Sequence, residues 1–156
     1  MKLLVKFDGD DVESIRDKIS SGLIGYATDL MGPRGKSTVW LFTVNGDVIV
    51  VHTRMTDVEG WNEVGALVFK LMKEKSIFPV MIPLPLVWRS IFEIKKLIIE
   101  QDHFLAESGI QIKNSKNQLF TILCSENPFQ IEISAPFYDG GFLPEYDFNE
   151  YEAILI

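Results

Sequence analysis

The stretch that decides the fold is TVWLFTVNGDVIVVHT, residues 38–53, because it carries the strongest β-hairpin pattern in the chain. Its two halves are rich in β-branched and aromatic residues, which is typical of strands. Asn45-Gly46 tolerates positive φ at both positions and predicts a two-residue type I′ turn. That turn sets the register, with these facing pairs: Val44 and Asp47, Phe42 and Ile49, Trp40 and Val51, and Val39 and His52. Both faces of the hairpin are largely apolar, so we expect it in the middle of a sheet.

A short strand and a helix are expected before the hairpin. Residues 2–7 are predicted to form the strand. Asp10 and Asp11 suit the positive N-terminal end of a helix dipole. The apolar stripe of this helix falls at helical spacing on Val12, Ile15, Ile19 and Leu23. Residues 26–37 are then predicted to form a loop.

A second helix is expected after the hairpin. Thr56 and Glu59 have the spacing of a capping box. The apolar stripe that follows them has helical spacing and consists of Trp61, Val64, Leu67, Val68, Leu71 and Met72. Residues 76–87 contain three prolines, which exclude a central strand and indicate an extended edge or a crossover.

The last third of the chain contains short β-like runs separated by turn residues. The runs are Ile94–Glu100, Phe104–Ile112, Leu119–Ser125 and Phe129–Ser134, and they predict an antiparallel meander with a bulge near Gly109. The sequence therefore predicts an α+β fold, a single domain spanning residues 1–156. It would have a mostly antiparallel sheet, two helices, a C-terminal β-meander and an extended acidic segment laid over the body.

Charge is distributed unevenly along the 156 residues. The chain has 15 Lys and Arg against 22 Asp and Glu, a net charge of −7. Residues 117–156 hold seven of the acids and no Lys or Arg, which leaves 15 acids and all 15 bases in residues 1–116. This asymmetry disfavours nucleic acid and anionic membranes as partners, because both would repel the acidic part. It is compatible with a basic protein partner, or with a terminus that only solubilises the chain.

The acidic part is also rich in aromatic residues. Residues 137–152 contain six aromatic side chains, five carboxylates and no base. Large aromatics are favoured at the centres of interfaces, and carboxylates around them would steer a cationic partner. The candidate partner-binding residues are Asp139, Glu145, Tyr146, Asp147, Phe148, Glu150, Tyr151 and Glu152. The alternative is that the aromatics cover a sheet edge and the carboxylates are only solvated.

No catalytic or metal-binding motif is present, so we expect neither enzymatic activity nor a cofactor. Gly35-Lys36-Ser37 resembles the end of a phosphate loop, but Leu30 stands where that loop needs a glycine. His52 and His103 have no partner at metal-ligand spacing, and the single cysteine, Cys124, excludes an internal disulfide. The longest apolar run, residues 77–88, is too short and too rich in proline to span a bilayer. We therefore expect a cytoplasmic protein.

The final third resembles a known class of proteins. The resemblance is carried by Glu107–Ile110, Leu119–Leu123, Pro128–Ile133 and Phe142–Tyr146 with Tyr151. This pattern of strands and turns is similar to the closing meander of small bacterial immunity proteins of polymorphic toxins, including contact-dependent growth inhibition systems. The resemblance implies a non-enzymatic protein that binds a cognate toxin domain, often a basic nuclease. Two other functions stay open: an adaptor that assembles through a sheet edge, and a small enzyme with a carboxylate cleft.

Overall fold

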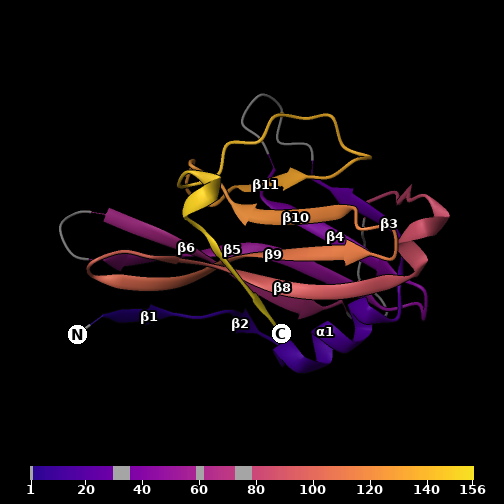
Figure 1. The fold of residues 1–156 in the computed structure, drawn as a ribbon, viewed down its shortest axis with the longest axis horizontal. Coiled ribbons are helices and arrows are strands. Elements are labelled where there is room, and N and C mark those ends of the chain that lie inside the picture. The colour runs from indigo at the N-terminus through magenta and orange to yellow at the C-terminus, as the bar shows by residue number, and fades with distance from the viewer. Residues whose placement is uncertain (1, 30–35, 59–61, 73–78) are drawn as a thin grey trace.

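The computed structural model of the protein describes residues 2–29, 36–58, 62–72 and 79–156. These residues form one α-helix and two six-stranded sheets, and the two sheets are layered as Figure 1 shows. The predicted α+β class with two helices is therefore wrong, because the protein is mostly β, with 57% strand and 12% helix.

The first sheet contains the central hairpin. Its strand order is β2-β6-β5-β4-β3-β7. The bounds of these strands are Asp8–Gly9 for β2, Asn62–Leu71 for β6, Val48–Val58 for β5, Thr38–Thr43 for β4, Leu23–Thr28 for β3 and Ile82–Pro83 for β7. As expected, β4 and β5 lie inside the sheet and the proline-containing β7 lies at its edge.

The second sheet contains the expected meander. Its strand order is β11-β10-β9-β8-β12, and β1 pairs in parallel with one end of β9. The bounds are Ile131–Ser134 for β11, Leu119–Cys124 for β10, Phe104–Asn114 for β9, Ile91–Glu100 for β8, Glu152–Leu155 for β12 and Leu3–Val5 for β1. Strands β8 to β11 are consecutive and antiparallel, so the meander is confirmed as a group of strands.

The predicted first helix is present as α1, Val12–Ser20. The Asp11 carboxylate caps it by accepting a hydrogen bond from the Glu13 amide, at 3.2 Å. Ile15 and Ile19 of the predicted stripe are buried against the first sheet and β8. The capping acid agrees with the sequence pattern, but Leu23, the last residue of the predicted stripe, lies outside the helix and begins β3.

The central hairpin is shifted by one residue from its predicted register. Leu41 pairs with Ile49, and Val39 pairs with Val51. Only Gly46 of the turn residues has a positive φ, of 89°, so the strands are joined through a glycine bulge rather than a two-residue type I′ turn. The observed register places those four apolar side chains on one buried face, whereas the predicted one would set Val39 against a histidine.

Strand β6 takes the place of the predicted second helix. It pairs with β5 along its whole length. Val64 and Ala66 belong to one hydrophobic cluster, and Leu67 and Phe69 belong to the other. Because both faces are buried, apolar residues stand at helical spacing as well as at alternate positions, and the periodicity does not distinguish the two structures. The predicted capping box is absent, because β5 continues through Thr56.

Two further predictions need correction or fall partly outside the described residues. The predicted loop over residues 26–37 begins too early, because β3 continues to Thr28, and residues 30–35 lie outside the described part. Glu59 and Trp61 of the predicted helix, and residues 76–78 of the proline segment, also lie outside it.

Ser108 connects the two sheets at a bulge. The register between β8 and β9 shifts so that Ser108, next to the predicted position Gly109, is the extra residue. The Ser108 hydroxyl is fully buried and donates to the Gly65 carbonyl of β6 at 2.7 Å. The bulge therefore turns a β9 side chain toward the other sheet.

The N-terminal residues also join the two sheets. Strand β1 pairs in parallel with β9 of the second sheet, and β2 pairs in parallel with β6 of the first. Between them, the Phe7 amide donates to the Glu107 carboxylate at 2.8 Å. No helix among the described residues is long and apolar enough to cross a membrane.

Candidate functional site

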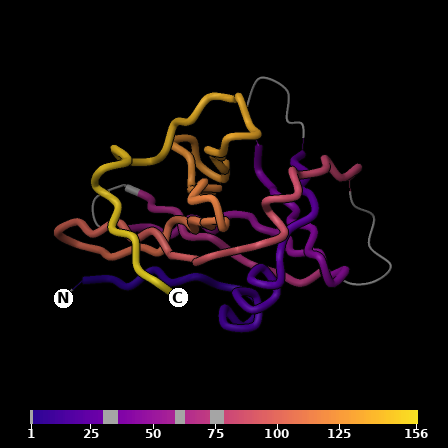
Figure 2. The backbone as a smooth tube through the Cα atoms, turned by 45° about the vertical axis from the view of Figure 1, so that its right-hand side comes forward, coloured from indigo at the N-terminus to yellow at the C-terminus, as the bar shows by residue number. Residues whose placement is uncertain are grey.

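The acidic segment, residues 135–152, leaves β11 and arches over one end of the sheets before the chain enters β12 (Figures 1 and 2). Backbone hydrogen bonds hold it against the end of β10. The Glu126 amide donates to the Leu143 carbonyl at 3.0 Å, and the Glu145 amide donates to the Cys124 carbonyl at 3.2 Å. The segment therefore packs on the body of the protein, as the sequence predicts. The residues that follow it form an edge strand, β12, which the sequence did not indicate.

Some aromatic side chains of the acidic segment point into the protein. The Phe137 ring packs on Phe120 and Trp88, with centroids 4.9 and 5.5 Å away. Tyr146 and Tyr151 are half-buried against the smaller hydrophobic cluster, and Tyr146 lies 6.3 Å from the Phe104 ring. The Tyr151 hydroxyl accepts a hydrogen bond from the Tyr146 amide at 3.2 Å. These residues anchor the segment.

Phe148 instead lies at the surface, beside Phe142 and Leu143. It lies at the start of a short 3₁₀ turn, Phe148–Glu150, and 40% of its surface is exposed. Its ring meets that of Phe142 edge to face, at 5.5 Å. The nearby Leu143 is 58% exposed. Large apolar side chains placed together on a surface are a common mark of a contact site.

Four carboxylates of the acidic segment are exposed and unpaired. Asp139, Asp147, Glu150 and Glu152 form no ion pair with any residue that the structure describes. In the body of the protein, by contrast, Glu107 is paired with Lys96 at 2.5 Å. Within the described residues, the base that contacts the segment through an aromatic ring is Lys36, whose ammonium lies 4.8 Å from the centroid of the Tyr138 ring.

Glu145 differs from the other acids because its side chain is largely buried. Its two carboxylate oxygens accept long hydrogen bonds from the Gly65 amide, at 3.3 and 3.4 Å, and it lies beside the buried Cys124. Burial raises the pKa of Glu145 to about 7, and the Gly65 amide opposes that rise. Burial also raises the pKa of Tyr151, with Glu145 contributing. Glu145 and Tyr151 thus act within the fold rather than as exposed contacts.

A hollow of about 450 Å³ lies in the acidic segment. Its lining consists of Glu126, Phe142, Leu143, Pro144, Glu145, Tyr146, Asp147 and Phe148. Four of the eight predicted residues line it, while Asp139, Glu150, Tyr151 and Glu152 do not. Sequence reasoning missed Glu126, because it stands in a turn that was interpreted only as a separator of strands, and it missed the exposure of Leu143.

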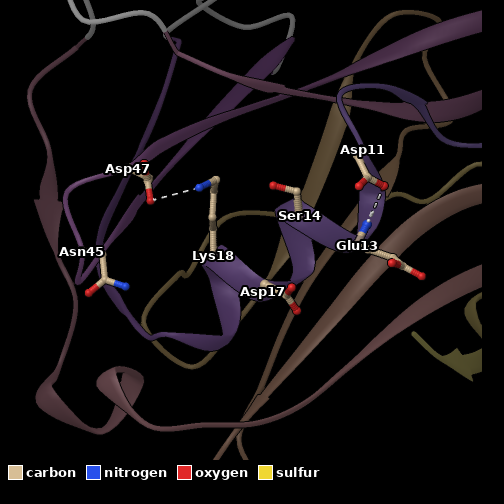
Figure 3. Close-up of a pocket in the computed structure, with 7 residues that line it drawn as sticks. All are labelled: Asp11, Glu13, Ser14, Asp17, Lys18, Asn45 and Asp47. Carbon is tan, nitrogen blue, oxygen red and sulfur yellow. Dashed lines mark hydrogen bonds and ion pairs between the residues drawn. The ribbon is translucent and has the colours of Figure 1, made fainter.

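A second hollow, of about 430 Å³, lies between α1 and the turn after β4 (Figure 3). Four carboxylates line it, but three have partners in the fold: Asp11 caps the helix, Asp17 pairs with Arg16 at 2.9 Å, and Asp47 pairs with Lys18 at 3.6 Å. Within the described ranges, no three Asp, Glu, His or Cys side chains are grouped as metal ligands. This hollow is accordingly part of the local helix and turn structure.

Comparison with known proteins finds no family profile, no curated protein and no solved structure that matches this chain. The resemblance to immunity proteins therefore depends on the strand-and-turn pattern alone. The function has to be argued from the geometry of the acidic segment.

Proposed function

We propose that this protein is a cytoplasmic immunity or inhibitor protein that binds a basic, nuclease-like bacterial toxin domain in a stoichiometric complex. The observation that supports this is the acidic segment. It holds four exposed carboxylates that form no ion pair with any described residue, together with the exposed Phe148 and Leu143, on a segment fixed to the sheets by backbone hydrogen bonds.

The two kinds of side chain would contribute differently to binding. Exposed carboxylates accelerate the encounter with a basic partner and select against acidic ones. Phe148 and Leu143 would then be buried in the complex, where apolar anchors slow dissociation. A nuclease needs a basic surface to hold phosphates, so an acidic protein bound there would exclude its substrate.

The first experiment identifies the partner and tests protection. The tagged protein is used to capture its partner from an extract of its own cells, and the partner is then expressed in a host with and without this protein. We expect a complex of equal stoichiometry and growth only when both are present. A captured partner without toxicity, or toxicity that the protein does not relieve, would contradict the proposal.

The second experiment tests the role of the carboxylates. The test variant replaces Asp139, Asp147, Glu150 and Glu152 by their amides. The control variant makes the same change in net charge at exposed acids elsewhere that form no ion pair with any described residue: Glu13, Asp57, Glu63 and Asp102. We expect the test variant to associate about tenfold more slowly at low salt, and the difference to shrink as salt rises. Equal association rates for the two variants would place the contact surface elsewhere.

The third experiment tests the apolar anchor. Phe148→Ala is compared with Phe92→Ala, a phenylalanine of β8 that is 67% exposed. We expect only Phe148→Ala to accelerate dissociation, by about tenfold or more, with little change in association. Identical dissociation of both variants would remove Phe148 from the interface.

One observation favours a second candidate function, that of an adaptor. Strand β12 is the outer strand of its sheet, all four of its residues are exposed, and Leu155 is 64% exposed. An exposed edge of this kind can pair with another strand. Concentration-dependent self-association that Leu155→Lys abolishes would support assembly through this edge.

The enzyme alternative receives less support from the hollow. A carboxylate pair for acid–base catalysis shifts the pKa values of its members through their mutual charge. The pKa of Glu145 is instead raised by burial, and no second carboxylate contributes to the shift.

A further inference from the structure

The turn between β10 and β11 holds a phenylalanine in the left-handed backbone conformation. The Gln130 amide donates to the Asn127 carbonyl at 3.2 Å and closes a four-residue turn with Pro128 in its second position. Phe129, in the third position, has a φ of +63°. Glycine or asparagine normally occupies that position, because a bulky side chain there is strained. A different residue at position 129 would therefore relieve the strain.

Packing in the core does not offset this strain. Phe129 is 62% exposed, and it belongs to neither hydrophobic cluster of the described residues. Strained residues gather at binding sites, where the strain is part of how the site works. The combination of strain and exposure at Phe129 therefore points to a ring that is presented for contact.

The turn that carries Phe129 pairs with the acidic segment. An antiparallel bridge joins Ser125 to Pro144. It sets Glu126 directly opposite Leu143, and the Glu126 amide donates to the Leu143 carbonyl at 3.0 Å. Opposite residues of an antiparallel pair share one face, so the exposed residues Glu126 and Leu143 are neighbours on the surface. Phe129 follows Glu126 by three residues in the same turn.

One partner can cover both Leu143 and Phe129. Three residues of extended chain span at most about 11 Å, which limits the distance between the Cα atoms of Glu126 and Phe129. A standard protein interface buries about 800 Å² on each partner, a patch roughly 30 Å across. Residues 125–130 contain a single charged side chain, that of Glu126, so this turn adds no base to the surface. The turn therefore extends the acidic and apolar surface of the segment.

We propose that Phe129 is a further anchor of the toxin-binding surface, and that the basic partner presents an apolar cavity for its ring. This inference rests on the proposed function. The ring would be buried in that cavity, as aromatic anchors of interfaces are. The closed turn fixes the backbone beneath the ring before binding, so little conformational freedom is lost when the complex forms. Glu126 would meet cationic groups around the cavity.

Two substitutions separate the ring from the strain. Phe129→Ala removes the ring but keeps a residue that disfavours positive φ, whereas Phe129→Asn removes the ring and the strain together. We expect Phe129→Asn to melt about 2–4 °C above Phe129→Ala, because asparagine tolerates the backbone conformation of this turn. Calorimetry of the two purified variants measures the difference. Equal melting temperatures would show that the turn is not strained, which would overturn the proposal.

The binding test uses the toxin domain that the wild-type protein captures. We expect Phe129→Ala and Phe129→Asn each to dissociate from it about tenfold faster or more than wild type, with little change in association. Phe92→Ala, at a phenylalanine of β8 that is 67% exposed, is the control and should dissociate at the wild-type rate. Wild-type dissociation of both Phe129 variants would exclude the ring from the interface.

The same measurements separate this inference from the proposed function. If the protein neutralises a captured toxin domain and both Phe129 variants dissociate as wild type does, the anchor is wrong and toxin inhibition stands. If the captured partner has no toxicity but leaves both Phe129 variants faster than wild type, toxin inhibition is wrong and the anchor is supported.

Discussion

At the scale of single residues, Glu145 has an unusual consequence for stability. The native state holds its proton up to a pH of about 7, because burial disfavours the charged carboxylate. An unfolded chain releases that proton near the ordinary glutamate pKa of about 4.3. Between these two values the native state binds more protons than the unfolded state, so the free energy of unfolding falls as the pH rises.

Glu145→Gln should remove this pH dependence. We expect wild-type protein to lose about 1–2 kcal/mol of stability between pH 5 and pH 8 through this group, after allowance for its partial exposure to solvent. The glutamine variant should not lose that contribution, because its amide is neutral throughout. Denaturant unfolding at several pH values measures the difference, with Glu152→Gln as an exposed control. Parallel pH profiles for wild type and Glu145→Gln would contradict the assignment.

The candidate site shows what a sequence can and cannot reveal at this scale. The seven acids after residue 117 are visible in the sequence, and so is their mixing with aromatic residues. Which acid is buried depends on which residue of the segment packs against Gly65 and Cys124. That contact is between residues far apart in the sequence, so no local sequence pattern indicates it. Glu145 was therefore grouped with exposed acids such as Asp147, although it lies against the core.

At the scale of elements, the turn of the central hairpin can be tested directly. Gly46 has a φ of 89°, so Gly46→Val should destabilise the protein by about 1–3 kcal/mol through backbone strain. Asn45 has no positive φ, so Asn45→Ala should change stability by about 0.5 kcal/mol or less. Denaturant midpoints of the two variants decide between the observed turn and a type I′ turn, in which both substitutions would be costly.

The bulge in β9 at Ser108 leads to a second prediction at the scale of elements. Ser108→Ala removes the buried hydrogen bond to the Gly65 carbonyl, so that oxygen loses its side-chain donor. We expect a loss of about 1–3 kcal/mol in the free energy of unfolding. Ser134→Ala, an exposed serine at the end of β11, serves as the control. A loss no larger than that of the control would show that the sheets do not depend on this contact.

The elements also explain which parts of the fold were predictable. Helix α1 is half-exposed, so its apolar residues recur at one clear period. The meander was predictable for another reason, because turn residues separate its short β-like runs. Strand β6 is buried on both faces between Val64 and Phe69, and such a run fits a helix as well as a strand. The shift in the hairpin arises from the single positive φ of Gly46, which the dipeptide Asn-Gly does not specify on its own.

At the scale of the whole molecule, stability should not depend on oxidation or metal. Cys124 is a free, buried thiol whose pKa is raised by burial, and the described residues hold no metal-ligand group. We expect the melting temperature to stay unchanged with reductant and with chelator, measured separately by calorimetry. A fall of several degrees with chelator would reveal a structural metal, because such a metal contributes folding free energy directly.

The parallel pairing of β1 with β9 has a consequence for the newly made chain. Phe7 bonds to a carboxylate 100 residues further along, so during synthesis β1 has no strand partner until β9 has been made. At about 5–20 residues per second, this wait lasts roughly 5–20 s. Long-range strand pairing of this kind also slows folding in isolation, to the range of about milliseconds to seconds. Strand β1 is therefore accessible to chaperones for the whole of that time.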